Sequence, residues 1–358
     1  MPQISGKNLK KTGAYRANGK QVRSIAGIVR WAIAIGLLLL LVTGLGAGFY
    51  RWTTAELDFN KPRIEFEVPN GASLGQTIAI MQSAGINLPE WPFKALHKIR
   101  GRNSFVKAGV YEVTSSITPT QLLEKLLKGE VATVEFVFPE GWLFRQVRAR
   151  LSQTPGIKQD IDGVSDSEVL RLIGAAENHP EGLFFPDTYR VNKGASASSV
   201  LKNGYRVMQN RIGAAWTTRQ ANLPLRSPYE ALVLASIVEK ETGLASDRPM
   251  IASVFINRLR LGMRLQTDPS VIYGLGAGFD GNLRKRDLTQ DTPYNSYTRN
   301  GLPPTPIAMP GEASIKATLN PATSDALYFV ARGDGSSEFS STLDAHNRAV
   351  NRYQRGGK

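Results

Sequence analysis

Two carboxylates, Glu239 and Glu241, follow directly on an apolar stretch that runs from residue 231 to residue 238. Only Ser236 interrupts its apolar residues, which predicts a helix that is buried on every side. A glutamate in the last turn of such a helix lies at the negative end of the helix dipole, and burial also disfavours its charged form. Both effects raise a carboxyl pKa, and a carboxyl of raised pKa suits a general acid.

The sequence also predicts where this helix begins and ends. Ser227 is a capping residue, Pro228 takes the first helical position, and Glu230 is placed to reach back to the cap. Gly243 is expected to end the helix in the left-handed conformation. The two glutamates are about 200° apart around the helix axis, so they cannot both face one substrate bond. The residues alone leave open which of them is the acid, or whether both are solvated.

Polar, uncharged segments follow the helix. They contain Gln266, Thr267, Tyr294, Asn295 and Tyr297, and a Gly-Leu-Pro-Pro turn at 301–304. Amides, hydroxyls and phenols of this kind are suited to a groove that hydrogen-bonds a polar, uncharged polymer and stacks on its rings. A second carboxylate is also available in this part of the sequence, at Asp268, Asp287 or Asp291.

A membrane segment lies near the start of the chain. Residues 31–50 carry no charge, and 20 helical residues span about 30 Å, the thickness of a bilayer core. Residues 1–30 contain seven Lys and Arg and no acid, so the positive-inside rule predicts a basic cytoplasmic arm and an exported main body. We therefore expect a single-pass protein of the inner (plasma) membrane, anchored in the lipid bilayer through residues 31–50. A cleaved signal peptide is the alternative, but its apolar region would be shorter.

The composition excludes several classes of function. The net charge of +14 suggests nucleic-acid binding, but half of it lies in the basic arm, and no nucleic-acid motif concentrates the rest. We expect no nucleic-acid partner. The absence of cysteine rules out a thiol nucleophile, and the three histidines, His97, His179 and His346, show no metal-binding spacing. No phosphate-binding loop is present, so no metal or cofactor is expected.

The exported part predicts an α+β fold in two domains. Residues 60–137 alternate short strands and helices, including a capping box at Thr118. Residues 138–358 form a larger mixed α+β domain with helices near 142–153, 166–176 and 196–214, a helix that starts near Ser246 and stops at Gly262, and a hairpin at 327–342.

Several motifs in this larger domain resemble the endolytic murein transglycosylases of the MltG (YceG-like) family. They occur in order over more than half of the chain. The matching stretches are 139–141, 181–189, 235–242, 254–259, 265–269, 294–297, 301–304 and 346–347. The front module matches the position of the LysM-like subdomain of that family, and the N-terminal anchor also fits.

The resemblance implies a chemistry. The family's catalytic acid is a glutamate followed by threonine, which is Glu241 here, with Glu239 the less favoured candidate. The resemblance implies that Glu241 protonates the glycosidic oxygen between N-acetylmuramic acid and N-acetylglucosamine. It then removes the C6 hydroxyl proton, which forms a 1,6-anhydro end and terminates the nascent strand. Gln266, Thr267, Tyr294, Asn295, Tyr297 and Glu239 are expected to bind substrate, which is the glycan strand of peptidoglycan.

Two alternatives stay open at this point. A binding scaffold could hold glycan strands and recruit a peptidoglycan synthase without cutting them. A hydrolytic muramidase would use water in place of the C6 hydroxyl and would generally need a second carboxylate.

Overall fold

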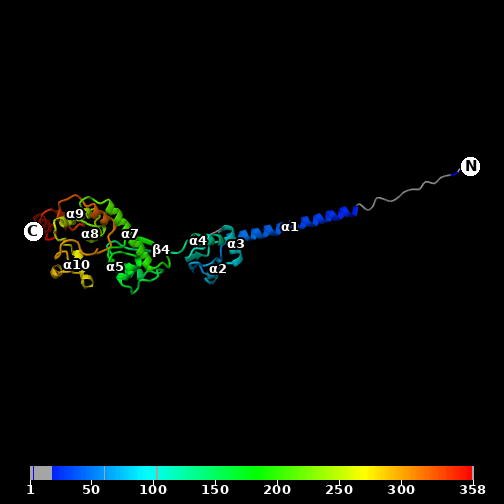
Figure 1. Ribbon diagram of the computed structural model, residues 1–358, viewed down its shortest axis with the longest axis horizontal. Helices are drawn as coiled ribbons and strands as arrows, with labels where there is room; N and C mark the ends of the chain where they lie inside the picture. Colours follow the sequence, from blue (N-terminus) through cyan, green and yellow to red (C-terminus); the bar gives the residue numbers. More distant parts are fainter. Residues whose placement is uncertain (1–2, 4–17, 60, 102–103, 357–358) are drawn as a thin grey trace. The chain divides into compact units, whose positions relative to one another are not determined.

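The computed structural model describes residue 3 and residues 18–59, 61–101 and 104–356. The chain divides into two compact units, residues 1–131 and residues 132–358. Both mix helices with short antiparallel two-stranded sheets, so the predicted α+β class is confirmed. Figure 1 shows the order of these elements along the chain.

The first unit begins with the long helix α1 (Asn18–Thr54). Its portion Gly27–Thr54 has a mean hydropathy of 2.3, and none of its most apolar window is buried within the structure. This length and composition fit a single-pass membrane anchor, as the sequence predicts for residues 31–50.

A small core follows α1. Strands β1 (Arg63–Val68) and β2 (Gly109–Thr114) pair antiparallel, with Phe66 opposite Tyr111. Alternate residues of β1 are buried, and helices α2 (Leu74–Ser83), α3 (Glu90–Arg100) and α4 (Pro119–Lys128) complete the core. The predicted capping box at Thr118 is confirmed, since its side chain accepts from the Gln121 N–H and the Gln121 side chain accepts from the Thr118 N–H. A LysM-like identity for this module stays a prediction.

The second unit holds the remaining elements. Its two sheets pair β3 with β4 and β5 with β6. The front module predicted from the sequence, residues 60–137, includes β3. In the structure β3 pairs with β4, a strand of the second unit. The bounds are β3 (Thr133–Val137), α5 (Phe144–Ser152), α6 (Asp166–Ile173), β4 (Thr188–Asn192), α7 (Ala197–Thr217), α8 (Pro228–Glu241), α9 (Arg248–Arg260), α10 (Asp268–Leu275), a 3₁₀ turn at Gly276–Gly278, α11 (Lys285–Thr289), α12 (Glu312–Leu319), β5 (Tyr328–Ala331), β6 (Ser337–Ser340) and α13 (Leu343–Tyr353).

Helix α8 lies at the centre of this unit. All residues from 231 to 238 are buried, and α7, α9, α10 and α12 all pack against the helix. Its one buried polar side chain is satisfied, because the Ser236 hydroxyl donates to the Val233 carbonyl and accepts from the Ile307 N–H. A helix packed on all sides provides a rigid support for the residues at its end.

Two details of the predicted helix ends are wrong. The Glu230 carboxylate bonds the N–H and guanidinium of Arg226 and does not close a capping box on Ser227. At the other end, α8 stops at Thr242, which is extended at φ −147° and ψ 138°, and Gly243 is not left-handed. The Thr242 hydroxyl accepts from the Leu244 N–H, and this side-chain turn replaces the glycine-based one.

Candidate active site

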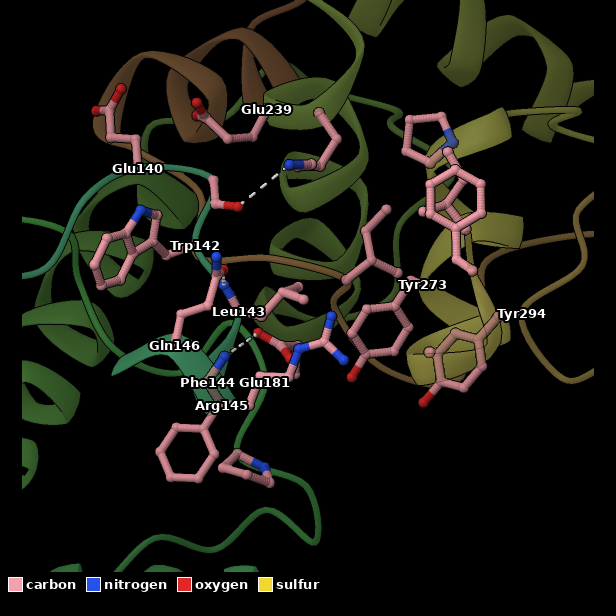
Figure 2. A pocket seen from close by; sticks show the side chains of 18 of the residues that line it. Glu140, Trp142, Leu143, Phe144, Arg145, Gln146, Glu181, Glu239, Tyr273 and Tyr294 are labelled. Atoms are coloured by element: carbon pink, nitrogen blue, oxygen red, sulfur yellow. Dashed lines mark hydrogen bonds between the residues drawn. The ribbon is translucent and has the colours of Figure 1, made fainter. Parts of the chain in front are cut away.

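A cleft of about 1100 Å³ opens beside the end of α8. Helix α8 contributes Glu239, Lys240 and Glu241 to its wall. The start of α5, the residues around Glu181 and helix α10 contribute most of the remaining lining, and Tyr294 is also part of it. Figure 2 shows Glu140 and Glu239 at one side of this cleft, and Glu181 beside Tyr273 at the other. A polar cleft of this size has room for several sugar rings of a polymer.

Glu241 is the last residue of α8 and lines the cleft. Burial raises the pKa of its carboxyl to about 7, and the nearby Asp268 carboxylate acts in the same direction. A hydrogen bond from Thr267 and the charge of Arg258 oppose these effects and lower the same pKa. The carboxyl therefore exchanges its proton near neutral pH, which is the property required of a group that serves as acid and then as base.

The Thr267 side chain holds the Glu241 carboxyl in place. Its hydroxyl donates to Oε1 of Glu241, and its own N–H donates to the Ser296 hydroxyl at 2.9 Å. The Ser270 hydroxyl contacts both the Thr267 carbonyl, at 2.9 Å, and the Ser296 hydroxyl, at 2.8 Å. Thr267, Ser270 and Ser296 are all buried, so this hydroxyl network fixes the carboxyl without bulk water.

The backbone before Thr267 is strained. Gln266 has a φ of 50°, in the left-handed region that non-glycine residues rarely adopt. Its N–H donates to the Ser296 carbonyl at 3.1 Å. The buried Arg258 of α9 secures the same segment, since its guanidinium donates to the Leu265 carbonyl at 2.6 Å and to the Leu327 carbonyl at 2.7 Å. Gln266 thus orients Thr267, and it does not line the cleft.

Glu239 also lines the cleft, but its carboxylate is already occupied. It accepts from the Gly311 N–H at 3.0 Å and the Ser314 hydroxyl at 2.7 Å, and it lies 3.6 Å from the Arg248 guanidinium. Glu239 therefore caps the N-terminus of α12. Because Glu239 and Glu241 are about 200° apart around the helix axis, one can cap α12 while the other is held by Thr267.

The tyrosine motif is divided between the cleft and the structure behind it. Tyr294 lines the cleft, and its ring packs edge-on against Tyr273 at 4.8 Å. The Asn295 side chain is buried and donates to the carbonyls of three residues between 287 and 290. The Tyr297 hydroxyl donates to the Asp268 carboxylate at 2.6 Å. Direct contacts of Asn295 and Tyr297 with glycan stay predictions.

The three aspartates considered as second carboxylates all have protein partners. Asp268 accepts from Tyr297, and Asp287 accepts from the Arg284 N–H at 2.8 Å, at the start of α11. Hydrogen bonds from the Arg299 guanidinium lower the pKa of Asp291 to about 2. None of the three is among the residues that line the cleft.

Sequence reasoning missed a carboxylate that does line the cleft. Glu181 is 4% exposed and accepts from the Phe144 N–H at 3.0 Å (Figure 2). Burial raises its pKa to about 7, while hydrogen bonds, including one from the Tyr273 hydroxyl, act to lower it. Its position in an aromatic segment suggested a core role, and that segment is indeed core at Leu183, Phe184 and Phe185. The isolated acid between Pro180 and Gly182 was the available signal.

No group of three metal-ligating side chains occurs in the ranges of the chain that the structure describes. The arrangement can instead support proton transfer by a buried carboxyl in a cleft wide enough for a polymer. The fold and the site therefore define a class of protein: a mixed α+β unit that carries one such acid at the end of a central buried helix.

Comparison with known proteins gives this class a family. The family model of the YceG-like family matches residues 66–352, and the chain belongs to that family. A crystal structure of a YceG-like protein from Listeria monocytogenes is similar, with 32% identity and a TM-score of 0.50, and the match covers 80% of this chain and 99% of that one.

Two relatives carry a functional name. The endolytic murein transglycosylase of Bacillus subtilis (strain 168) is 30% identical over 313 residues, a match that covers 82% of this chain and 86% of the relative. The endolytic murein transglycosylase of Streptococcus pneumoniae (strain D39) is 26% identical, and the match covers 89% of this chain but 64% of the relative.

Proposed function

We propose that this protein is a membrane-anchored endolytic lytic transglycosylase that cleaves glycan strands of peptidoglycan. Its family and the names of its relatives support a peptidoglycan-cleaving enzyme of the lyase type. The observation that carries the proposal is Glu241, a carboxyl with a pKa near 7 at the end of a buried helix, held by Thr267 at the wall of a large polar cleft.

The geometry supplies a sequence of proton transfers. Because Thr267 donates to Oε1 of Glu241, the proton of the neutral acid is left on Oε2. Glu241 gives this proton to the glycosidic oxygen between N-acetylmuramic acid and N-acetylglucosamine as the bond to the anomeric carbon breaks. The resulting carboxylate is stabilised by Thr267 and Arg258. It then removes the proton of the muramoyl C6 hydroxyl, whose oxygen bonds the anomeric carbon and closes the 1,6-anhydro ring.

A hydrolytic muramidase is the second candidate, and Glu181 is the observation that favours it. A hydrolase generally uses a second carboxylate to activate water or to form a covalent intermediate. Glu181 is a second carboxyl in the cleft. It accepts hydrogen bonds from the Phe144 N–H and the Tyr273 hydroxyl, which leaves it less free to bind a water molecule. We therefore favour the transglycosylase.

The mass of the products separates the two reactions. The full chain is incubated with polymerised, uncrosslinked glycan in water enriched in heavy oxygen, and the ends are analysed by mass spectrometry. A transglycosylase yields anhydro ends with no heavy oxygen. Reducing ends that are heavier by one molecule of heavy-oxygen water would overturn the proposal in favour of the muramidase.

We also propose that α1 crosses the plasma membrane with residues 1–30 in the cytoplasm and the second unit outside. The charge asymmetry of the sequence and the apolar length of α1 support this orientation. A cut made next to the membrane would end the elongation of a nascent strand, and a peptidoglycan synthase is the partner that this role implies. Fusion of a periplasm-dependent reporter to each end tests the orientation: activity at the N-terminal fusion would contradict it.

A further inference from the structure

The front module exposes two large apolar side chains on α3, Trp91 and Ile99, and a third, Phe105, just beyond it, where the Ser104 carbonyl lies 3.1 Å from Nε2 of His97 on α3. Trp91 is 75% exposed, Ile99 61% and Phe105 88%. On α3, the exposed Trp91, Lys94 and Lys98 follow i, i+3, i+7 spacing and share one side, while Phe93 and Leu96 are buried on the other. We name Trp91, Lys94, Lys98, Ile99 and Phe105 the α3 surface. Large apolar side chains exposed on and beside one helix are typical of an interaction site.

The charge around this surface is mainly positive, and two of its cations are paired: Lys94 with Glu90, and the Arg100 guanidinium with the Glu124 carboxylate of α4 at 3.5 Å. Among the described residues from 90 to 107, the cations are Lys94, Lys98, Arg100 and Lys107, and Glu90 is the one acid. The outward face of the β1–β2 sheet carries acids instead, at positions 65, 67 and 112. Aromatic and aliphatic side chains interleaved with lysines are the composition that binds the interface of an anionic bilayer.

The module is also fixed directly to the end of α1. Phe49 and Trp52 of α1 pack against its core, and the Thr120 hydroxyl of α4 donates to the Thr53 carbonyl at 2.9 Å. Leu57, three residues beyond α1, is already part of that core. Helix α4 contacts both α1 and α3, and packed helices lie about 8–10 Å apart. Helix α4 therefore links α3 to the end of α1 within one packed module.

We propose that the α3 surface rests on the lipid headgroups of the same membrane that α1 crosses, with Trp91, Ile99 and Phe105 in the interface and Lys98 against anionic headgroups. This inference depends on the proposed anchoring by α1 but is independent of the proposed cleavage chemistry. It orients the front module by contact as well as by its tether. A glycan strand is the competing occupant, since aromatic side chains also stack on sugar rings.

The absence of cysteine from the chain permits a direct test. Single cysteines are placed at Phe105→Cys in the α3 surface, at Glu65→Cys on the acidic outward face of β1, and at Leu39→Cys within α1. Each full-length variant is labelled with an environment-sensitive dye and reconstituted into vesicles of zwitterionic and anionic lipid whose acyl chains are brominated. Bromine quenches only dyes that reach the bilayer.

The dye at position 105 is expected to lose most of its fluorescence, as does the dye at position 39, whereas the dye at position 65 retains its signal. Lys98→Glu, or salt of about 1 M that shortens the Debye length to about 3 Å, is expected to reduce quenching at 105 and to leave 39 unchanged. Quenching at 39 without quenching at 105 overturns the inference, and so does equal quenching at 65 and 105. Loss of quenching at 39 overturns the anchoring itself.

A second arm addresses the competing occupant. Uncrosslinked glycan strands are added to the variant labelled at position 105 in detergent micelles without lipid. An unchanged dye spectrum is expected. A saturable spectral shift together with absent quenching in vesicles would assign the surface to the polysaccharide and overturn the membrane contact.

Discussion

Replacing Glu241 with glutamine is the most informative perturbation of this protein. Glutamine keeps the shape of the side chain and an oxygen that can accept from Thr267. It removes the proton that the reaction consumes and returns. General acid–base catalysis contributes roughly 10²–10⁴-fold, so the formation of anhydro products is expected to fall by at least about 10²-fold.

The same substitution is expected to lower activity but to increase the stability of the native state. Burial raises the pKa of Glu241 from 4.5 to about 7. The native state therefore keeps a proton that the unfolded chain has already released, and the stability of the native state falls as pH rises from about 4.5 to 7. The full difference corresponds to about 3 kcal/mol above pH 7. Glutamine does not titrate, so Glu241→Gln is expected to be more stable than the wild type by about this amount at pH 8 and nearly equal to it at pH 4.

Two assays on one protein preparation examine both effects. Mass spectrometry of digested, uncrosslinked glycan measures anhydro ends, and denaturant unfolding at pH 4 and pH 8 measures stability. A variant that is inactive but less stable than the wild type at pH 8 would mean that misfolding caused the loss. Retained anhydro product would refute the role of Glu241, and a stability difference that does not depend on pH would refute the cause given for its pKa.

Four further predictions concern the neighbours of Glu241 and its pH dependence. Above about pH 7, kcat/KM of the wild type is expected to fall tenfold per pH unit because only neutral Glu241 donates; a flat profile from pH 5 to 9 would contradict this. Thr267→Val removes a hydrogen bond that lowers the pKa of Glu241, so the alkaline limb of the pH profile of kcat/KM should move to higher pH. The loss of the same bond should lower kcat at least about tenfold, and an alkaline limb that does not move would argue against the contact. Glu239→Gln should cost about 0.5–2 kcal/mol of stability through the cap of α12 and leave kcat within about tenfold of the wild type; a loss as deep as that of Glu241→Gln would reverse the assignment. Glu181→Gln should raise the melting temperature relative to the wild type above pH 7 but not at pH 4, because burial raises the pKa of this carboxyl as well. Calorimetry measures both melting temperatures, and the same difference between variant and wild type at the two pH values would contradict this prediction.

Local signals in the sequence predicted a large part of the fold. The capping box at Thr118 and the apolar run of α8 each depend on residues a few positions apart, and each has its expected structure. The end of α8 was predicted incorrectly because Thr242 offers a side-chain turn that competes with the glycine after it. Propensity alone does not decide between two such local solutions.

The site was less predictable, because its contacts join residues far apart in the sequence. Thr267 was expected to bind substrate, and its observed bond to Glu241 crosses 26 positions. Glu181 reaches the N–H of Phe144, 37 positions away, and no spacing rule connects it with Glu241. In the sequence, Arg258 looks like an exposed residue on the polar side of a helix. Its contact with the Leu265 carbonyl depends on how the loop after α9 turns back toward the helix.

The capping of α12 by Glu239 has a consequence for genetics. A helix more than 70 positions downstream secures the final turn of α8, through the Gly311 N–H and the Ser314 hydroxyl. Substitutions of Ser314 remove its hydroxyl, and a side chain at residue 311 would collide with the Glu140 carboxylate, so either change would weaken the support of the helix end that carries Glu241. A screen for defective wall remodelling should therefore recover alleles in this distant helix that are separable from simple loss of protein, and second-site revertants that restore a polar cap there should rescue them.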